Sequence, residues 1–472
     1  MRTDATTGRS SASGNLGRLC AWSIVLVFAM AAGCASLPDY HVLHHHAATR
    51  APVPVVGHRG ELSAKQSAAV VATLQASGDR TLLEHHLELM QRINSSPLTV
   101  GNATRLLIDG PAAHAAMFKA IAAARDHVNL QTYIFEADEI GEKLARLLLT
   151  KQAQGVQVNV LYDSVGSMRS PPEFFERLRE GGVAVCEFNP VNPLKAKKIA
   201  LNHRDHRKLL VADGVVAYTG GINISAVYST SSSASKSRKS IQEDGWRDTQ
   251  IEVRGPAVAE FQKLFMQTWE SQRCAARVNG NYYPVPKPTG DRIVRVIGST
   301  PADALNLIYV EMLSAITSAR KSIHITMAYF VPDPQTIRAL KEQAQRGVDV
   351  VLILPGVSDL WVVFHAGRSH YGDLLEAGVR IYERKDALLH AKTAVIDGVW
   401  STVGSANMDW RSFLHNDELN AVILGEGFGR EMEKVFQADL DVAKPIDREA
   451  WSRRSPLLRL REIAARVWEY WL

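Results

Sequence analysis

The sequence predicts an α/β protein built from two homologous halves that arose by duplication. Three observations support this prediction. The chain has 472 residues, of which 46% are hydrophobic and 22% are charged, so its composition is globular and its length exceeds one small core. Segments that combine a helix end, a turn glycine and a β-branched strand occur twice. They keep the same order in both halves, which chance similarity would not preserve.

Three pairs of segments carry the repeat. The first pair runs from a helix end into a strand and an aromatic residue, and the next two pairs each run from a turn glycine into a strand. The paired segments are 124–135 and 319–330, 154–161 and 346–353, and 182–185 and 378–381. Strands that alternate with helical segments in this way predict an α/β unit in each half.

Composition divides the rest of the chain. Residues 35–60 have the Pro, His and Ala content of a tether, 63–93 have apolar positions at helical spacing, and 275–290 are rich in Asn, Pro, Gly and Tyr. We therefore expect six parts: an export signal at 1–34, a tether and helical lead-in at 35–100, a first domain at 101–274, a linker at 275–290, a second domain at 291–442, and an amphipathic tail at 443–472.

The N-terminus has the pattern of an export signal. Arginines precede a short apolar stretch at 21–30, and small residues follow it up to Cys34. Small residues directly before a cysteine resemble the bacterial lipobox, in which Cys34 would be lipidated. The alternative is an uncleaved anchor helix. Both interpretations predict a bacterial envelope protein held on a membrane and facing the periplasm or exterior.

Two cysteines remain in the main body, Cys186 and Cys274. They could form one disulfide, but their spacing indicates neither a disulfide framework nor a metal site. The preferred interpretation is that both are buried or free. The formal net charge of +5 fits an acidic partner such as phosphate or an anionic membrane, without choosing between them.

The strongest chemical signal is a motif that occurs once in each half. Each copy has His and Lys two residues apart, an Asp five residues after the Lys, and a Gly-x-x-Asn turn downstream. The residues are His206, Lys208, Asp213 and Asn223 in the first copy, and His390, Lys392, Asp397 and Asn407 in the second. The segment after each Lys is apolar, so a buried strand would direct His and Lys to one face. An imidazole beside an ammonium, with an amide on a glycine turn, is suited to phosphoryl chemistry.

Both copies resemble the HKD motif of the phospholipase D superfamily, and the resemblance covers about residues 101–440. It implies two phospholipase D-like α/β/α sandwich domains, packed as a pseudo-twofold pair with one shared active site. It also implies a phosphohistidine mechanism with no metal or other cofactor. His206 would be the nucleophile and His390 the general acid and base, although near symmetry permits the reverse. Lys208, Lys392, Asn223 and Asn407 would hold phosphoryl oxygens.

Superfamily members orient each histidine with a downstream carboxylate. The matching residues are Glu418, which follows His390, and Asp248 in the first half. Asp213 and Asp397 belong to the catalytic motif, but they end their strands. We expect these two aspartates to fix a turn rather than to touch substrate.

Further segments, including 377–382, 404–413 and 246–248, resemble bacterial cardiolipin synthases. That family joins two phosphatidylglycerols and releases glycerol. The resemblance implies membrane phospholipids as partners, with phosphatidylethanolamine as a further candidate, and no nucleic acid. The alternatives are a phospholipase D that hydrolyses phospholipids to phosphatidic acid and a non-catalytic lipid-binding protein, which would have lost part of a motif.

The C-terminal tail has the pattern of an amphipathic helix. Ser455-Pro456 can cap and begin it. One predicted face carries the apolar residues Leu457, Leu460, Ala464, Val467, Trp468 and Trp471. This face would lie in a membrane interface, or it would pack on the protein body.

Overall fold

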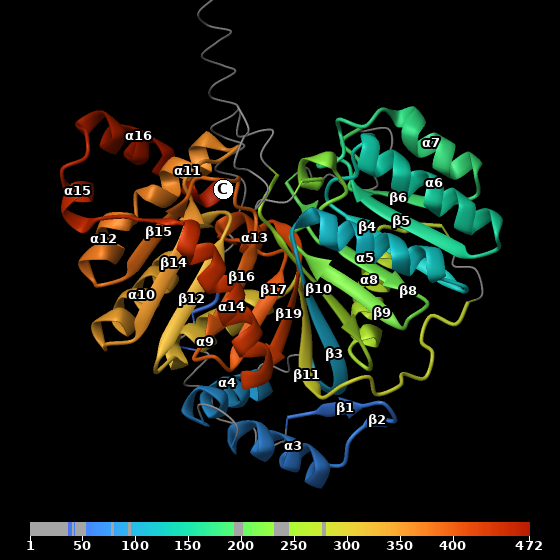
Figure 1. Cartoon of the computed structure of the whole chain (residues 1–472), viewed down its shortest axis with the longest axis horizontal. Coiled ribbons are helices and arrows are strands. Elements are labelled where there is room, and N and C mark those ends of the chain that lie inside the picture. The colour runs from blue at the N-terminus through green and yellow to red at the C-terminus, as the bar shows by residue number, and fades with distance from the viewer. Residues whose placement is uncertain are drawn as a thin grey trace, which may run out of the picture. The chain divides into compact units, whose positions relative to one another are not determined.

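The computed structural model describes residues 36–39, 42, 53–76, 80–92, 96–192, 202–230, 245–275 and 280–472 (Figure 1). The chain forms two units, Met1–Leu37 and Pro38–Leu472, and the second contains the whole α/β body. The predicted export signal with Cys34 lies outside the described residues. No helix in the described ranges is both long enough and apolar enough to cross a bilayer.

The first half is a seven-stranded sheet with helices on both faces (Figure 1). Its strands pair in the order β6-β5-β4-β8-β9-β10-β3, and only the pairs among β4, β5 and β6 are parallel. The strands are β3 (Leu98–Ile108), β4 (His127–Thr132), β5 (Gln157–Asp163), β6 (Ala184–Phe188), β8 (Leu209–Ala212), β9 (Val216–Gly220) and β10 (Thr249–Arg254). The helices are α5 (Asp109–Ala123), α6 (Glu139–Ala153), α7 (Pro172–Glu180) and α8 (Val258–Ser271).

The second half repeats this topology. Its strands pair in the order β15-β14-β12-β16-β17-β19-β11, with the parallel pairs again at one end. The strands are β11 (Arg292–Ser299), β12 (Ser322–Met327), β14 (Asp349–Pro355), β15 (Arg380–Arg384), β16 (Lys392–Ile396), β17 (Trp400–Gly404) and β19 (Asn416–Leu424). The helices are α9 (Leu307–Ser318), α10 (Pro334–Gln345), α11 (Trp361–Arg368), α12 (Tyr371–Glu376) and α14 (Glu426–Val442). The prediction of two homologous α/β domains is therefore confirmed.

The two sheets meet where β3 pairs with β11 in antiparallel fashion. β3 and β11 are the edge strands of the two seven-stranded sheets, so the seam joins equivalent edges, as a pseudo-twofold relation requires. Side chains on β5 alternate between two cores: Val158 and Val160 pack with α5, α6 and α7, whereas Leu161 belongs to a core that contains α8 and α14. Because this second core takes residues from both halves, it holds the halves together as well as each sheet.

The predicted turn glycines have the conformation that their role requires. Gly155 and Gly347 follow α6 and α10, and their φ angles are +86° and +90°. A side chain is strained in this left-handed region, so glycine ends the helix and turns the chain into the next strand. At the other end of these helices, Asp138 and Asp333 cap the first turn by accepting backbone N–H groups.

The lead-in consists of β1 (Val55–Gly57), β2 (Gly60–Glu61), α3 (Ala64–Ala76) and α4 (Arg80–Arg92). β1 adds to the sheet beside β3. On α4, the fully buried His86 lies between the Ser314 hydroxyl at 3.3 Å and the Trp400 indole N–H at 3.2 Å. Burial lowers the pKa of His86 to about 3, so the ring is neutral. From residue 53 onward, this segment is part of the packed body.

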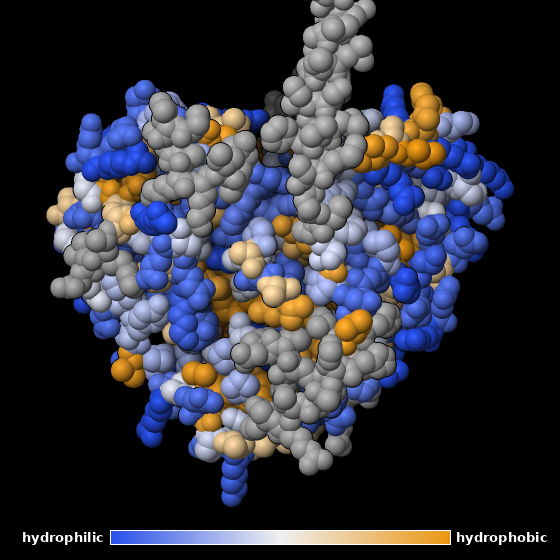
Figure 2. Space-filling view, turned by 180° about the vertical axis from the view of Figure 1, so that it is seen from behind, coloured by the Kyte–Doolittle hydropathy of each residue, from blue (hydrophilic) through white to orange (hydrophobic). Residues whose placement is uncertain are grey.

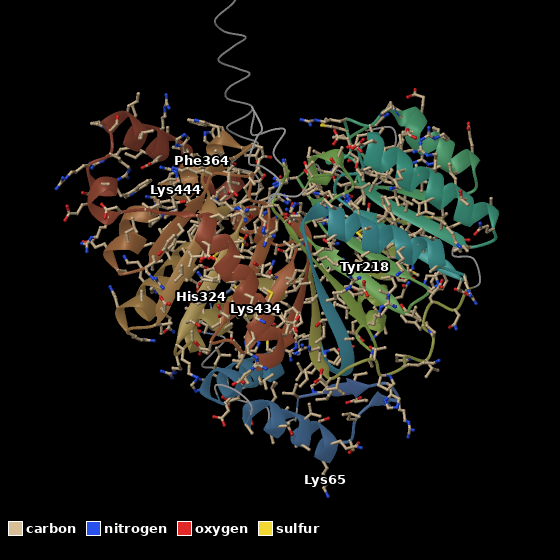
Figure 3. All side chains as sticks on the ribbon, viewed as in Figure 1. Lys65, Tyr218, His324, Phe364, Lys434 and Lys444 are labelled. Carbon is tan, nitrogen blue, oxygen red and sulfur yellow. A yellow bond between two sulfur atoms is a disulfide. The ribbon has the colours of Figure 1, made fainter. Side chains whose placement is uncertain are left out.

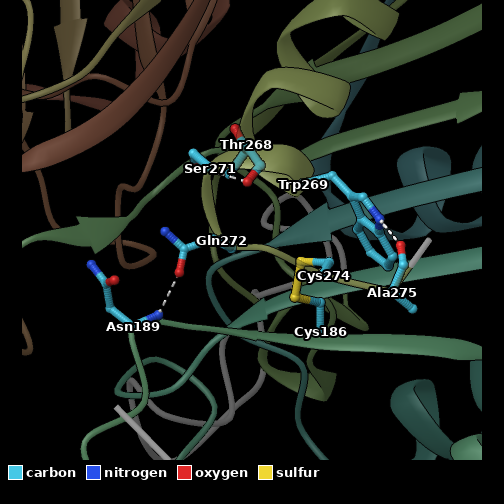
Figure 4. The surroundings of a disulfide bond; sticks show 8 residues. All are labelled: Cys186, Asn189, Thr268, Trp269, Ser271, Gln272, Cys274 and Ala275. Carbon is cyan, nitrogen blue, oxygen red and sulfur yellow. Dashed lines mark hydrogen bonds between the residues drawn. A yellow bond between two sulfur atoms is a disulfide. The ribbon is translucent and has the colours of Figure 1, made fainter. Parts of the chain in front are cut away.

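Cys186 and Cys274 form a disulfide, with their Cα atoms 5.7 Å apart (Figure 4). The interpretation of free or buried thiols was wrong, because sequence spacing does not show that the middle of β6 and the segment after α8 lie side by side. Hydrogen bonds from the Asn189 N–H to Gln272 and from the Trp269 indole to Ala275 fix the same two segments. The disulfide therefore joins the sheet to the helix that covers it.

The Cys186→Ala/Cys274→Ala double variant should unfold more easily than the native chain, by about 2–4 kcal/mol, because the bridge restricts the unfolded chain. The bridged residues are separated by 88 positions in sequence. Urea unfolding of the variant and of the oxidised protein measures the difference. Addition of reductant should bring the native chain to the stability of the variant, and equal stability before reduction would contradict the prediction.

The tail continues from α14 through β20 (Lys444–Pro445), α15 (Arg448–Ser452) and α16 (Pro456–Arg466) to a 3₁₀ turn at Glu469–Trp471. β20 pairs with β15, the edge strand of the second sheet, and Figure 3 labels Lys444 there. At the end of the chain, the Trp471 ring stacks on His415, and the Leu472 carbonyl accepts the Arg411 N–H at 2.7 Å. The tail therefore closes back onto the segment after Asn407.

Candidate active site

Each motif histidine lies against a strand of the other half. The strand β7 (Arg204–Asp205) pairs with β19, and the N–H of His206 donates to the Asp417 carbonyl at 2.9 Å. In the mirrored arrangement, Leu389 forms a bridge with Arg247, and the N–H of His390 donates to the Arg247 carbonyl at 2.8 Å. The pseudo-twofold relation therefore holds at the level of single backbone hydrogen bonds.

The carboxylates follow directly from this exchange. Glu418 comes one residue after Asp417, and its oxygens lie 3.0 and 3.1 Å from His206 Nδ1. Asp248 comes one residue after Arg247 and lies 2.7 Å from His390 Nδ1. Sequence order would pair each histidine with the carboxylate of its own half. The structure exchanges the partners, so each half supplies the carboxylate that orients the histidine of the other.

The two histidine–carboxylate pairs differ in what supports the carboxylate. Glu418 accepts a hydrogen bond from the Ser405 hydroxyl at 2.5 Å and one from the Asn416 amide at 3.2 Å. At the position equivalent to Ser405, the first half has Gly221, and a Cβ atom there would lie 2.2 Å from Asp248 Oδ1. This glycine is needed for close approach, because the carboxylate occupies the space of its missing side chain.

Gly221→Ala should lower catalytic turnover by about 10²-fold or more, since the added methyl group displaces the carboxylate that orients His390. Gly372→Ala on α12 is the matched control, because a Cβ atom there meets no other atom within 4 Å. Initial rates of the two variants, at equal folded fraction by circular dichroism, give the comparison. Equal rates would contradict the role of this close approach.

The lysines lie beside the histidines, as the His-x-Lys spacing predicts. Lys208 Nζ donates to the carbonyl of His206 at 2.5 Å, and Lys392 makes the same bond to His390. Each ammonium also lies over an aromatic ring, Tyr133 at 5.2 Å and Tyr329 at 6.0 Å from the ring centroids. Both lysines are buried, so in their protonated form they interact more strongly with nearby charges than exposed lysines would.

Aromatic rings around the histidines were missed by the sequence interpretation. Tyr133 packs against His206 with ring centroids 5.0 Å apart, and Trp246 packs against His390 at 5.2 Å. The Tyr228 hydroxyl lies 3.3 Å from His390 Nδ1. Tyr133 and Tyr329 both follow the first repeated strand, but they are one position out of register, because Tyr329 is equivalent to Ile134.

The motif asparagines lie beside the same groups. Asn223 accepts the Ile134 N–H at 3.1 Å and donates to the Tyr228 hydroxyl at 3.2 Å. Asn407 is buried, its N–H donates to the Ser412 hydroxyl at 3.0 Å, and its side-chain oxygen has no hydrogen-bond partner. Among the described residues no donor pairs with this oxygen. Because a phosphoryl oxygen is also an acceptor, Asn407 could bind it only through its amide N–H groups.

Asp213 and Asp397 do not belong with the catalytic groups. Asp213 accepts backbone N–H groups of Arg125, Asp126 and His127, and it adopts a φ of +53°. Asp397 makes the equivalent bonds to residues 320–322 with a φ of +51°. These contacts support the expectation that each aspartate fixes the turn before the first repeated strand rather than touching substrate.

Comparison with known proteins agrees with this geometry. A family described as "Cardiolipin synthase, PLD-like domain" matches residues 117–237 and 312–440, one copy in each half. The cardiolipin synthase of Geobacillus sp. (strain WCH70) is 36% identical over 383 residues, which is 81% of this chain and 74% of that protein.

The chain belongs to the cardiolipin synthase family.

A second member, the cardiolipin synthase of Listeria innocua, is 34% identical over 372 residues, covering 78% of this chain and 75% of that protein. Among solved structures, the phosphatidylserine synthase of Haemophilus influenzae aligns with a TM-score of 0.56 at 12% identity, covering 78% of this chain and 95% of that one. The structural likeness shows a shared fold.

In this family member, electrostatic coupling joins the groups of both halves. Burial lowers the pKa of His206 to about 4, and Lys208 and Lys392 both contribute to the lowering while Glu418 opposes it. Burial likewise lowers the pKa of Lys208 to about 7 and that of Lys392 to about 8. Each lysine acts on the histidine of the other half as well as its own. The two motifs therefore form one electrostatic unit.

A cavity of about 1070 Å³ adjoins this unit. Tyr133 and Trp246, whose rings pack on the histidines, line it together with residues of the segment 165–170 and of α11. Figure 3 labels Phe364, one of the α11 residues in the lining. Both halves contribute walls, and the lining mixes apolar side chains with serine hydroxyls and carboxylates.

Proposed function

We propose that this chain is a phosphatidyltransferase of the cardiolipin synthase type, which joins two phospholipids through a phosphohistidine intermediate. The observation that carries the proposal is the exchanged pairing of two histidines and two carboxylates, Glu418 with His206 and Asp248 with His390. The family relationship supports the reaction type. The cavity supports a substrate with both polar and apolar parts.

In the proposed first step, His206 Nε2 attacks the phosphorus of the donor lipid. Its Nδ1–H is held by Glu418, so the Nε2 lone pair is free to form the nitrogen–phosphorus bond. The phosphorus–oxygen bond to the leaving alcohol breaks, and His390 gives that oxygen its proton. Lys208, Lys392, Asn223 and Asn407 hold the phosphoryl oxygens as charge develops on them.

In the second step, the neutral His390 removes the proton from the hydroxyl of the acceptor lipid. The acceptor oxygen bonds to phosphorus as the bond to His206 breaks, so the enzyme returns to its starting state. Asp248 holds the imidazolium of His390 while it carries the proton. His390 thus acts as acid in one step and as base in the next.

We propose phosphatidylglycerol as both donor and acceptor, with glycerol as the leaving group and phosphatidylethanolamine as the alternative partner. The test is to incubate the purified protein with labelled phosphatidylglycerol and to separate the lipids. Cardiolipin with free glycerol supports the proposal. Phosphatidic acid alone would replace it with a hydrolytic phospholipase D, which would use the same residues. No turnover under any condition would favour the non-catalytic lipid-binding alternative.

Turnover should fall as pH rises, in two stages. The first stage is the loss of the proton from His390, the proposed acid, whose pKa burial lowers below its ordinary value. The second stage lies at about 7 to 8. The pKa values of Lys208 and Lys392 are lowered to about 7 and about 8, and a lysine stabilises phosphoryl charge only below its pKa. A bound phosphate favours the protonated lysines, so kcat should decline at higher pH than kcat/KM does. Initial rates between pH 6 and 10 measure the decline of kcat and the decline of kcat/KM. Circular dichroism over the same range shows whether the fold persists. Constant kcat/KM across this range would contradict the prediction.

We also propose that the protein is exported and held on the envelope by a lipid on Cys34, with the N-terminal helix as the alternative anchor. The disulfide of Cys186 and Cys274 supports export, because such bonds persist in oxidising compartments. Cys34→Ala should abolish the mobility shift that follows inhibition of lipoprotein signal processing. An unchanged shift would remove the lipid anchor from the proposal.

A further inference from the structure

Helix α16 turns its apolar face outward. Six large hydrophobic residues of the tail are exposed: Leu457, Leu460, Ile463, Val467, Trp468 and Trp471. Val467 is 76% exposed and Trp468 is 58% exposed. Figure 2, which views the molecule from behind, shows hydrophobic side chains at its upper right edge, where this helix lies. The helix is amphipathic, as predicted, and among the described residues its large apolar side chains are mostly exposed, although Trp471 stacks on His415.

The opposite face of α16 holds the helix in place. Ala465 packs with Val363 and Ala366 of α11 and with Val331. The buried Glu462 is paired with Arg454, whose guanidinium lies 2.8 Å from a carboxylate oxygen and over the Trp451 ring. Within the described part of the chain, α16 therefore packs on the body through Ala465 and Glu462, and its large apolar side chains stay exposed.

Positive charge accompanies the apolar face. Arg459 and Arg461 are exposed, and Arg453 is exposed in an ion pair with Glu449, whereas Glu462 is buried in its ion pair. Glu469 is bound to His370 and Arg466. The exposed surface of this helix thus combines leucine, valine and tryptophan with an excess of arginine. This composition matches a bilayer surface that contains anionic lipid.

Exposed apolar side chains also lie at the cavity. α16 packs on α11. Leu360 caps the N-terminus of α11 and Trp361 is its first residue; they are 46% and 52% exposed, and Trp361 lines the cavity. On the wall contributed by the first half, Met168 is 70% exposed and also lines the cavity. Both walls therefore end in an exposed hydrophobic side chain.

We propose that α16 and the first turn of α11 dock on a bilayer of anionic phospholipid, so that the cavity opens toward the lipids. This inference rests on the proposed function for the identity of the substrate, but the docking itself depends only on the surface. A second copy of the chain fits this surface less well, because a twofold contact would bring the arginines of one α16 against those of the other.

The first test measures whether α16 enters the lipid. The full-length protein is incorporated into vesicles of phosphatidylglycerol and phosphatidylethanolamine, with or without bromine atoms on the acyl chains. Bromine quenches tryptophan only on contact, so the exposed Trp468 and Trp361 should be quenched. Trp468→Phe and Trp361→Phe should each remove part of the quenching. Quenching that is absent, or unchanged in both variants, would overturn the docking.

The second test compares two valine substitutions. Val467→Glu places a charge in the proposed surface, and Val285→Glu makes the same change at a valine that is 84% exposed elsewhere. Val467→Glu should lower turnover of vesicle lipid at least tenfold and leave turnover of detergent-dispersed lipid unchanged. Val285→Glu should alter neither rate. Equal vesicle rates in the two variants would overturn the proposal.

The two tests separate docking from catalysis. If the native protein turns over no lipid in either form, the proposed function fails while the quenching result still decides the docking. If sedimentation shows a dimer that Val467→Glu dissociates, the surface binds a second copy, and the bilayer proposal is overturned.

Discussion

His206→Ala and His390→Ala should each lower lipid transfer by at least about 10⁴-fold, because each removes one half of a two-step mechanism. Neither histidine can replace the other, since each is held at Nδ1 by its own carboxylate. His85→Ala is the matched control, because His85 is an exposed histidine on α4. Initial rates with labelled lipid measure the effect. A single variant that retains full activity would refute the shared site.

The same variants can distinguish the nucleophile from the acid. A phosphodiester with a nitrophenolate leaving group needs no proton donor, so His390→Ala should still release nitrophenol once per enzyme. The phosphohistidine should then accumulate on His206, because no base remains to activate the acceptor. His206→Ala should release none. A burst in His206→Ala, with phosphate on His390, would reverse the two roles.

Asp439→Asn should destabilise the protein by roughly 3–5 kcal/mol, the cost of leaving buried charge without its partner. Asp439, on α14, is buried and accepts two hydrogen bonds of 2.7 Å from the Arg247 guanidinium. Arg384 binds the same carboxylate. Asparagine keeps the shape of the side chain but removes the charge that the two guanidinium groups share. Each arginine keeps a second carboxylate, Asp109 at 3.8 Å from Arg247 and Asp386 at 2.9 Å from Arg384.

The measurement is urea unfolding of Asp439→Asn beside Asp441→Asn, an exposed aspartate on the same helix. The control should change stability by no more than about 0.5 kcal/mol. Asp439→Asn should also lower turnover. The Arg247 carbonyl accepts the His390 N–H, and Asp248, which orients His390, is the next residue. Equal stability of the two variants would show that the buried cluster contributes little.

Local pattern was enough to predict the two α/β halves and the His-x-Lys pairs, since strand period and turn glycines depend on neighbours in sequence. The carboxylates Glu418 and Asp248 could be named but not paired, because the pairing depends on how β7 and β19 meet. The disulfide was missed for the same reason. The apolar face of α16 was predicted from the sequence, but the sequence left open whether that face packs on the protein. The packing of Ala465 and the ion pair of Glu462 show that the opposite face does.

The exchanged pairing has a consequence for the newly made chain. His206 and Glu418 are separated by 212 residues, so neither half on its own contains an oriented histidine. A chain that has folded only its first half carries His206, the proposed nucleophile, without the carboxylate of Glu418 that orients it. A chain that has lost its second half by proteolysis is in the same state. Activity toward phospholipid therefore begins only when both halves have docked. The substrate of such an enzyme would be the lipid of the adjacent membrane. The need for both halves would therefore prevent an incompletely folded chain from cleaving that lipid.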